Sequence, residues 1–97
     1  MLKIIVHSIA EKELESAVVY YRNISRTLAN NFVASFQRVI GRIAVFTTAF
    51  PEVDSPLRKA HFPNFPYYLL FSIQDDIAKI LLVRHYRQKM KRIDGRF

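Results

Sequence analysis

An imidazole and two guanidiniums stand together near the end of the chain, in the run Arg84-His85-Tyr86-Arg87. They follow an apolar run that reads as a strand, and a basic segment comes after them. Histidine is the side chain whose ordinary pKa lies near physiological pH, so His85 could act as a general acid or base. Arginine carries forked donors that match phosphate oxygens. The spacing suits cleavage of a phosphodiester, and it also suits a basic docking surface that does no chemistry.

Alternation along a strand predicts which of these side chains point the same way. His85 and Arg87 are expected to share one face of the sheet with Val83 and Leu81. Arg84 and Tyr86 are expected to share the other face with Leu82. If that second face packs on helices, His85 and Arg87 project from the uncovered face.

A further cation, Arg58, lies on a predicted strand two ladder steps away, about 10 Å between backbones. Long side chains span that gap, so we expect Arg58, His85 and Arg87 to converge on one phosphate as the catalytic residues. In RNA cleavage His85 would move a proton and the arginines would stabilise the charge on phosphorus. Tyr86, or Tyr67 and Tyr68, would stack an unpaired base. Glu52, in the preceding loop, is a weaker candidate for the base, and a solvated loop carboxylate is the simpler reading.

Positive charge is concentrated at the C-terminal end. The 97 residues carry a formal net charge of +7, and residues 84–97 hold six bases against one acid. Such a density favours phosphate or an acidic protein as partner, with a solvated tail as the alternative. The residues expected to bind the RNA or another target are Lys59, Arg84, Tyr86, Lys89, Lys91 and Arg92.

Several classes of site are disfavoured by composition. Cysteine is absent, which excludes disulfides and thiolate metal sites. The histidines at positions 7, 61 and 85 are too widely spaced for a metal motif, so we expect neither a metal nor another cofactor. The first residues do not read as a targeting segment, and no apolar run reaches the length of a membrane span. We therefore expect a cytoplasmic protein.

Two helices are expected after a short first strand at residues 2–6. The first begins at Ser8, where Ser8 and Glu11 have the spacing of a capping box. The second spans about residues 25–46, and its apolar positions recur at helical spacing. Gly41 costs that helix about 1 kcal/mol relative to alanine, which suggests a close helix crossing there. The short turn between the two helices predicts an antiparallel hairpin.

Three strands are expected in the second half, at residues 58–62, 67–73 and 77–86, with residues 47–57 as a loop. The whole chain, 1–97, is then a single α+β domain. Its two layers are a four-stranded, mostly antiparallel sheet and an α-hairpin packed on one face. Residues 67–73 and 80–83 are apolar on both sides, and a half-exposed apolar strand is typical of a partner surface.

These elements, in this order, resemble the RelE/ParE superfamily of toxins from bacterial type II toxin–antitoxin modules. The resemblance spans nearly the whole chain. It rests on Leu28-Ala29 with Phe32, on Phe50-Pro51, on Arg58, on Phe65-Pro66-Tyr67, and on the last strand with His85 and Arg87. It implies a compact sheet-and-hairpin fold with the first strand beside the last. It also implies a role in plasmid stabilisation or growth control, and an acidic or amphipathic antitoxin that wraps the toxin.

The superfamily divides by target. RelE-like members cut messenger RNA in the ribosomal A site, and ParE-like members poison DNA gyrase. We favour a RelE-like, metal-independent endoribonuclease that acts on ribosome-bound mRNA. The alternatives are a ParE-like, non-enzymatic gyrase inhibitor and a degenerate toxin that only binds its antitoxin. Many relatives carry proline and an aromatic residue after the His-x-Arg element, whereas this chain continues Gln88-Lys89-Met90. A homodimer and a toxin–antitoxin hetero-oligomer both stay open.

Overall fold

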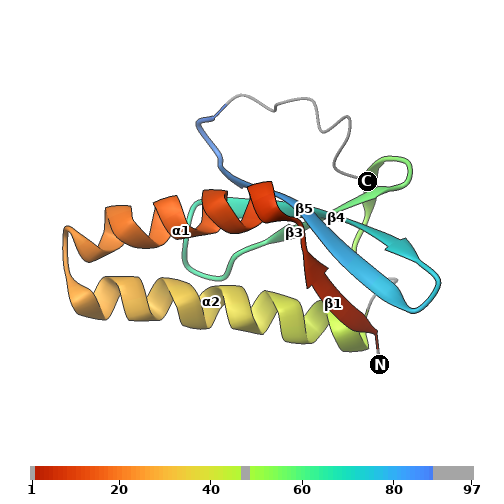
Figure 1. Ribbon diagram of the computed structural model, residues 1–97, viewed down its shortest axis with the longest axis horizontal. Coiled ribbons are helices and arrows are strands. Elements are labelled where there is room, and N and C mark those ends of the chain that lie inside the picture. Colours follow the sequence, from red (N-terminus) through yellow and green to blue (C-terminus); the bar gives the residue numbers. More distant parts are fainter. Residues whose placement is uncertain (1, 47–48, 89–97) are drawn as a thin grey trace.

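A computed structural model describes residues 2–46 and 49–88 of the chain. One strand is followed by two helices and then by four strands. The elements are β1 (Lys3–Val6), α1 (Ser8–Arg22), α2 (Arg26–Val45), β2 (Glu52–Asp54), β3 (Leu57–His61), β4 (Tyr67–Gln74) and β5 (Ile77–His85), as drawn in Figure 1. The predicted α+β class and the helix–helix hairpin are confirmed.

The sheet has five strands in the order β1-β5-β4-β3-β2. β1 runs parallel to β5, and the other neighbours are antiparallel. The first strand thus lies beside the last, as the resemblance implied. The prediction of four strands was wrong, because the expected loop contains β2, which pairs with β3 through Glu52 opposite Arg58. β2 is short and exposed and lies between Pro51 and Pro56. Its residues are typical of a turn, and it has no buried face that would mark it as a strand.

The N-cap of α2 was not predicted from the sequence, and the N-cap of α1 differs from the prediction. At α2, the Ser25 hydroxyl accepts the Leu28 N–H at 2.9 Å, as an N-cap does. At α1 the expected capping box is wrong by one residue. His7 is the N-cap and its Nδ1 accepts the Ile9 N–H at 3.1 Å, while Ser8 is already helical. β1 ends at Val6 and α1 begins at Ser8, so His7 is the single residue between them and occupies the N-cap position.

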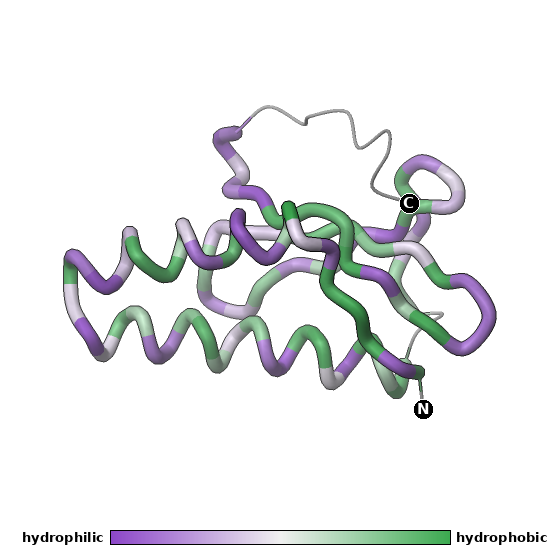
Figure 2. The backbone as a smooth tube through the Cα atoms, viewed as in Figure 1, coloured by the Kyte–Doolittle hydropathy of each residue, from purple (hydrophilic) through white to green (hydrophobic). Residues whose placement is uncertain are grey.

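The main core lies between the helical hairpin and one face of the sheet. Phe32 is fully buried at its centre, with ring centroids 5.0–5.2 Å from those of Tyr21, Phe62, Phe65 and Tyr67. The aromatic stripe of α2 is therefore core, as its helical spacing predicted. Figure 2 shows apolar and polar positions alternating along both helices. Within the two described ranges, no helix is long and apolar enough to cross a membrane.

Two expectations about packing were wrong. Gly41 is exposed, and a Cβ placed on it would meet no atom within 4 Å, so no helix crosses closely there. The apolar residues on the second face of the sheet do not form a half-exposed partner surface either. They make a separate buried cluster, in which no residue exceeds 7 % exposure: Leu57, Tyr68, Leu70, Leu81 and Leu82.

Candidate functional site

A bulge in β5 decides which face each candidate side chain occupies. Leu70 pairs with Leu82 but Phe71 pairs with Ile80, so Leu81 is an extra residue in the ladder. Ile80 and Val83 both pack in the helix-side core, while Leu81 and Leu82 both belong to the opposite cluster. Unbroken alternation cannot place neighbours on one face, so the predicted grouping of His85 with Leu81 was wrong, while its grouping with Val83 was right.

His85 lies on the helix side of the sheet as a consequence. Its ring meets that of Tyr67 edge-on at 5.1 Å. It lines a hollow of about 530 Å³, hereafter the aromatic pocket, between the C-terminal half of α1 and the end of β5. The pocket is lined by Tyr20, Tyr21, Ile24, Pro66, Tyr67, His85, Arg87 and Gln88. The expectation that His85 and Arg87 project from the uncovered face was therefore wrong.

A tight turn fixes the imidazole of His85. Its Nδ1 accepts the backbone N–H of Arg87 at 3.0 Å, and its carbonyl accepts the Gln88 N–H at 3.0 Å. A neutral imidazole whose Nδ1 accepts a hydrogen bond carries its proton on Nε2. In this conformation neutral His85 offers Nε2 as a donor, and it cannot take a proton from a 2′-hydroxyl there without changing tautomer.

Arg58 stays away from His85. Its Nη1 donates to the Phe50 carbonyl at 2.6 Å and its Nη2 lies 3.3 Å from Glu52 Oε1. Arg58 stands opposite Phe71, whereas His85 stands opposite Tyr67, four residues further along β4. Four steps of about 3.4 Å along the strand and two of about 4.8 Å across put the two Cα atoms roughly 17 Å apart. Arg58 therefore clamps the segment before β3.

The opposite face of the sheet carries a different cluster of polar side chains from β3, β4 and the end of β5. Lys59 Nζ lies 4.3 Å from the centre of the Tyr68 ring, which stacks on the Tyr86 ring at 6.2 Å. The Tyr86 hydroxyl and His61 Nδ1 share a hydrogen bond of 2.8 Å. We call Lys59, His61, Tyr68 and Tyr86 the far-face cluster.

His61 was missed as a candidate because it stands outside any motif. Its only sequence signal is that it follows Lys59 by two residues on a strand, which puts both on one face.

Arg84 lies beside this cluster and is buried, with 6 % of its surface exposed. Its Nε and Nη2 have no hydrogen-bond partner among the residues in view. Of the other basic residues predicted to bind a target or phosphate, one is described by the structure and three are not. Arg87 is exposed at the rim of the aromatic pocket. Lys89, Lys91 and Arg92 lie outside the described residues.

Three tyrosines of these two sites, Tyr21, Tyr67 and Tyr68, have raised pKa values. Burial raises the pKa of Tyr67 and of Tyr21, and neighbouring tyrosines add to both shifts. Burial also raises the pKa of Tyr68, although the nearby Arg84 cation lowers it in part. Their hydroxyls are thus donors rather than bases. In residues 2–46 and 49–88, no three histidine or acidic side chains come together as metal ligands.

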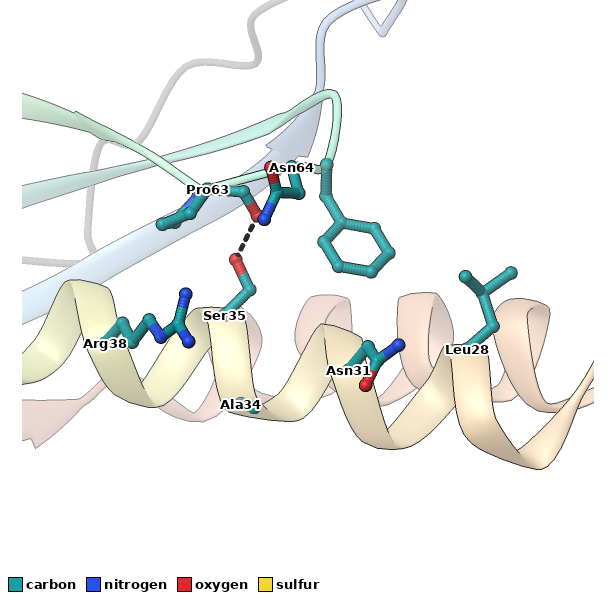
Figure 3. Close-up of a pocket in the computed structure, with 8 residues that line it drawn as sticks. Leu28, Asn31, Ala34, Ser35, Arg38, Pro63 and Asn64 are labelled. Atoms are coloured by element: carbon teal, nitrogen blue, oxygen red, sulfur yellow. Dashed lines mark hydrogen bonds between the residues drawn. The ribbon is translucent and has the colours of Figure 1, made fainter.

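A further hollow, of about 330 Å³, lies between α2 and the loop from β3 to β4. The Ser35 hydroxyl donates to the Pro63 carbonyl at 2.7 Å across it, and Figure 3 shows this bond joining helix and loop. Asn64 completes the turn with a positive φ of 66°. This joint holds the loop that delivers Phe65 and Tyr67 to the core and the aromatic pocket.

The comparisons with known proteins agree with this architecture. The sequence matches the family model described as "ParE toxin of type II toxin-antitoxin system, parDE" over residues 4–90. A solved chain described as "Chromosomal ParDE TA system from P. aeruginosa" has a TM-score of 0.75 and 15 % identity, with 88 % of this chain and 96 % of that chain covered. No curated protein matches the chain significantly.

A helical hairpin on a mixed sheet of this shape, together with these matches, defines a toxin of the RelE/ParE superfamily. Because the family model covers most of the sequence, the chain belongs to the ParE toxin family of parDE-type systems. The similar structure, at its low identity, speaks for the fold alone.

Proposed function

We propose that the chain is the toxin of a parDE-type module and that it inhibits DNA gyrase by binding, without breaking a bond itself. Membership of the ParE family supports this reading over the ribonuclease that the sequence favoured. One observation carries it. The Arg58 side chain is bound to the Phe50 carbonyl and its Cα lies roughly 17 Å from that of His85, so Arg58 does not join His85 and Arg87 on one phosphate.

A supercoiling assay tests the proposal directly. Purified toxin is titrated into DNA gyrase, relaxed plasmid and ATP, and supercoiled product is measured on gels. We expect inhibition that depends on toxin concentration. No inhibition at any concentration at which the toxin stays folded overturns the proposal.

A matched pair of variants locates the binding surface. Arg87→Ala removes an exposed cation at the rim of the aromatic pocket, and Arg38→Ala removes an exposed cation from α2. If the pocket end of the molecule meets gyrase, Arg87→Ala weakens inhibition about tenfold, the loss of one charged hydrogen bond, while Arg38→Ala has little effect. Equal effects would indicate a contribution from net charge alone.

Ribosome-dependent mRNA cleavage is the second candidate, and the far-face cluster favours it. Lys59 supplies a cation, His61 an imidazole, and Tyr86, which is 51 % exposed, a ring for base stacking. With translating ribosomes, primer extension would reveal A-site cuts. In this case His61→Ala abolishes the cuts and His85→Ala leaves them. Loss in His85→Ala alone would instead restore the role expected from the sequence.

The antitoxin of the same module is the expected partner, in a hetero-oligomer that keeps the toxin inactive. The net charge of +7 suits an acidic partner. Induction without the antitoxin is expected to stop growth. An inert phenotype from a folded toxin would point to a degenerate member that only binds its antitoxin.

A further inference from the structure

The hollow between α2 and the loop from β3 to β4, hereafter the loop pocket, is lined by hydrogen-bond donors. Its polar side chains are those of Asn31, Ser35, Arg38 and Asn64, and none of the described residues that line it is acidic. The 20 residues of α2 include no aspartate or glutamate, and neither does the loop. Amide and guanidinium N–H groups without a competing carboxylate attract an anion.

Most of these donors have no partner inside the molecule. Asn31, Arg38 and Asn64 are exposed, and their side chains make no hydrogen bond or ion pair within the described part of the chain. Ser35 differs, because it is 5 % exposed and its hydroxyl donates to the Pro63 carbonyl at 2.7 Å. That bond ties the loop to the helix, so the fold itself sets the shape of the loop pocket.

The two ends of the loop pocket differ in chemistry. Figure 3 shows Arg38 at one end of it and Leu28 at the other, with Asn31 between them. Ten residues of helix at about 1.5 Å each put the two ends about 15 Å apart. Phe65 lines the pocket from the loop, and its ring centroid lies 5.1 Å from that of Tyr21, near the turn between the helices. The Leu28 end is therefore apolar and aromatic, and the Arg38 end is cationic.

We propose that the loop pocket binds a mononucleotide, with its phosphate on Arg38 and its base against Leu28 and Phe65. The guanidinium fork matches two phosphate oxygens, and the amides of Asn31 and Asn64 supply donors for the third. A carboxylate is satisfied by the fork alone, so the two amides favour phosphate. Every base has a π face that stacks on an aromatic ring. The volume of about 330 Å³ lies in the range of small-molecule sites.

The loop pocket is separate from the sites described above. None of the described residues that line it belongs to the aromatic pocket or to the far-face cluster. The inference is thus independent of the gyrase target and of the antitoxin. A toxin that fails to inhibit gyrase is still expected to bind the nucleotide.

NMR titration of isotope-labelled, full-length toxin with adenosine monophosphate (AMP) tests the site. We expect the largest chemical-shift changes at the amides of residues 28–38 and 64–65. AMP should bind at least about tenfold more tightly than adenosine or inorganic phosphate, because each of these lacks one half of the ligand. Equal affinities for AMP and inorganic phosphate overturn the inference. Changes centred on the far-face cluster or the aromatic pocket also overturn it.

Variants at exposed positions give a second readout. Arg38→Ala should weaken AMP binding about tenfold or more, whereas Arg87→Ala, which removes an exposed cation elsewhere, should leave it unchanged. Asn31→Asp keeps the shape of the side chain and adds a negative charge, so it should weaken binding at least as much. Circular dichroism checks that each variant is folded. Equal effects of Arg38→Ala and Arg87→Ala would reduce the effect to net charge, and undiminished binding in folded Asn31→Asp would contradict a phosphate beside it.

A free nucleotide and the 5′-phosphorylated end of a nucleic acid strand share this chemistry, and a short single strand distinguishes them. The strand is titrated with and without its 5′-phosphate. A phosphorylated strand that binds more tightly than AMP, and that loses affinity in Arg38→Ala, supports the site and assigns it to strand ends. Weaker binding than AMP assigns it to free nucleotides. If both strands shift the same amides with equal affinity, the phosphate plays no part and the inference fails.

Discussion

Gly41 offers a prediction whose sign the structure decides. Glycine in the interior of a helix destabilises it, because it loses more backbone freedom on folding than any other residue. The sequence suggested that Gly41 is kept for a close crossing, in which case a methyl group would clash. The structure leaves the Cβ position open, with no atom within 4 Å, and Gly41 is exposed within α2. We therefore expect Gly41→Ala to stabilise the protein.

The expected gain follows from helix propensity alone, about 0.5–1 kcal/mol. For a domain of this size that corresponds to a rise of about 2–8 °C in Tm. The mirror substitution is available on the same helix. Ala34 is also exposed in the interior of α2, so Ala34→Gly should lower stability by about the same amount.

Urea unfolding followed by circular dichroism measures both variants against the parent. Equal slopes with opposite shifts of the midpoint are the expected result. A loss of stability in Gly41→Ala would refute the reasoning, because it would mean that something occupies the space beside the helix. If Ala34→Gly had no effect while Gly41→Ala stabilised, the propensity argument would fail for the first half of α2.

Three other outcomes follow from the same packing and can be measured in the same unfolding assay. Phe32→Ala should cost about 3–5 kcal/mol, a large part of a typical total stability, and a cost below about 2 kcal/mol would contradict its central place in the core. Ser35→Ala should cost about 1 kcal/mol, since it removes the bond that ties α2 to the loop from β3 to β4; no cost would mean that the joint is dispensable. Burial holds the pKa of Tyr21 and Tyr67 above 10.0, so stability should be fully present below about pH 10 and fall as the pH rises through the folded-state pKa values. A stability unchanged up to about pH 12 would show that these hydroxyls ionise as easily in the folded protein as in the unfolded chain.

Helical periodicity predicted the two helices and the role of the aromatic stripe well. Phe32 and its neighbours recur on one side of α2, and that side had no alternative but the core. The N-cap of α2, Ser25, was not predicted, although the helical pattern follows it directly. The cap of α1 was predicted at Ser8 but lies at His7, because β1 ends at Val6 and leaves His7 as the residue before the helix. The capping hydrogen bond runs from the Ile9 N–H to the His7 side chain.

The β2 strand could not be predicted, because nothing local requires it. Its three residues are exposed, and Arg58, which binds the Phe50 carbonyl and Glu52, ties this segment to β3. Those contacts also explain why Arg58 is absent from the site expected of it. A guanidinium that binds both a carbonyl and a carboxylate has a structural role. That role could not be predicted here, because it depends on the path of the loop.

The face of the sheet on which His85 lies could not be predicted from the sequence, because it depends on the bulge in β5. The run from Ile80 to Val83 is apolar throughout, so every register buries apolar side chains and the pattern hides an extra residue. The bulge at Leu81 inverts every assignment beyond it. A chain with the same His-x-Arg spacing but without the bulge would present its imidazole on the opposite face, beside a Lys59–Tyr68 pair. The motif alone therefore does not say which face of the sheet carries the imidazole, whereas the register of β5 against β4 does.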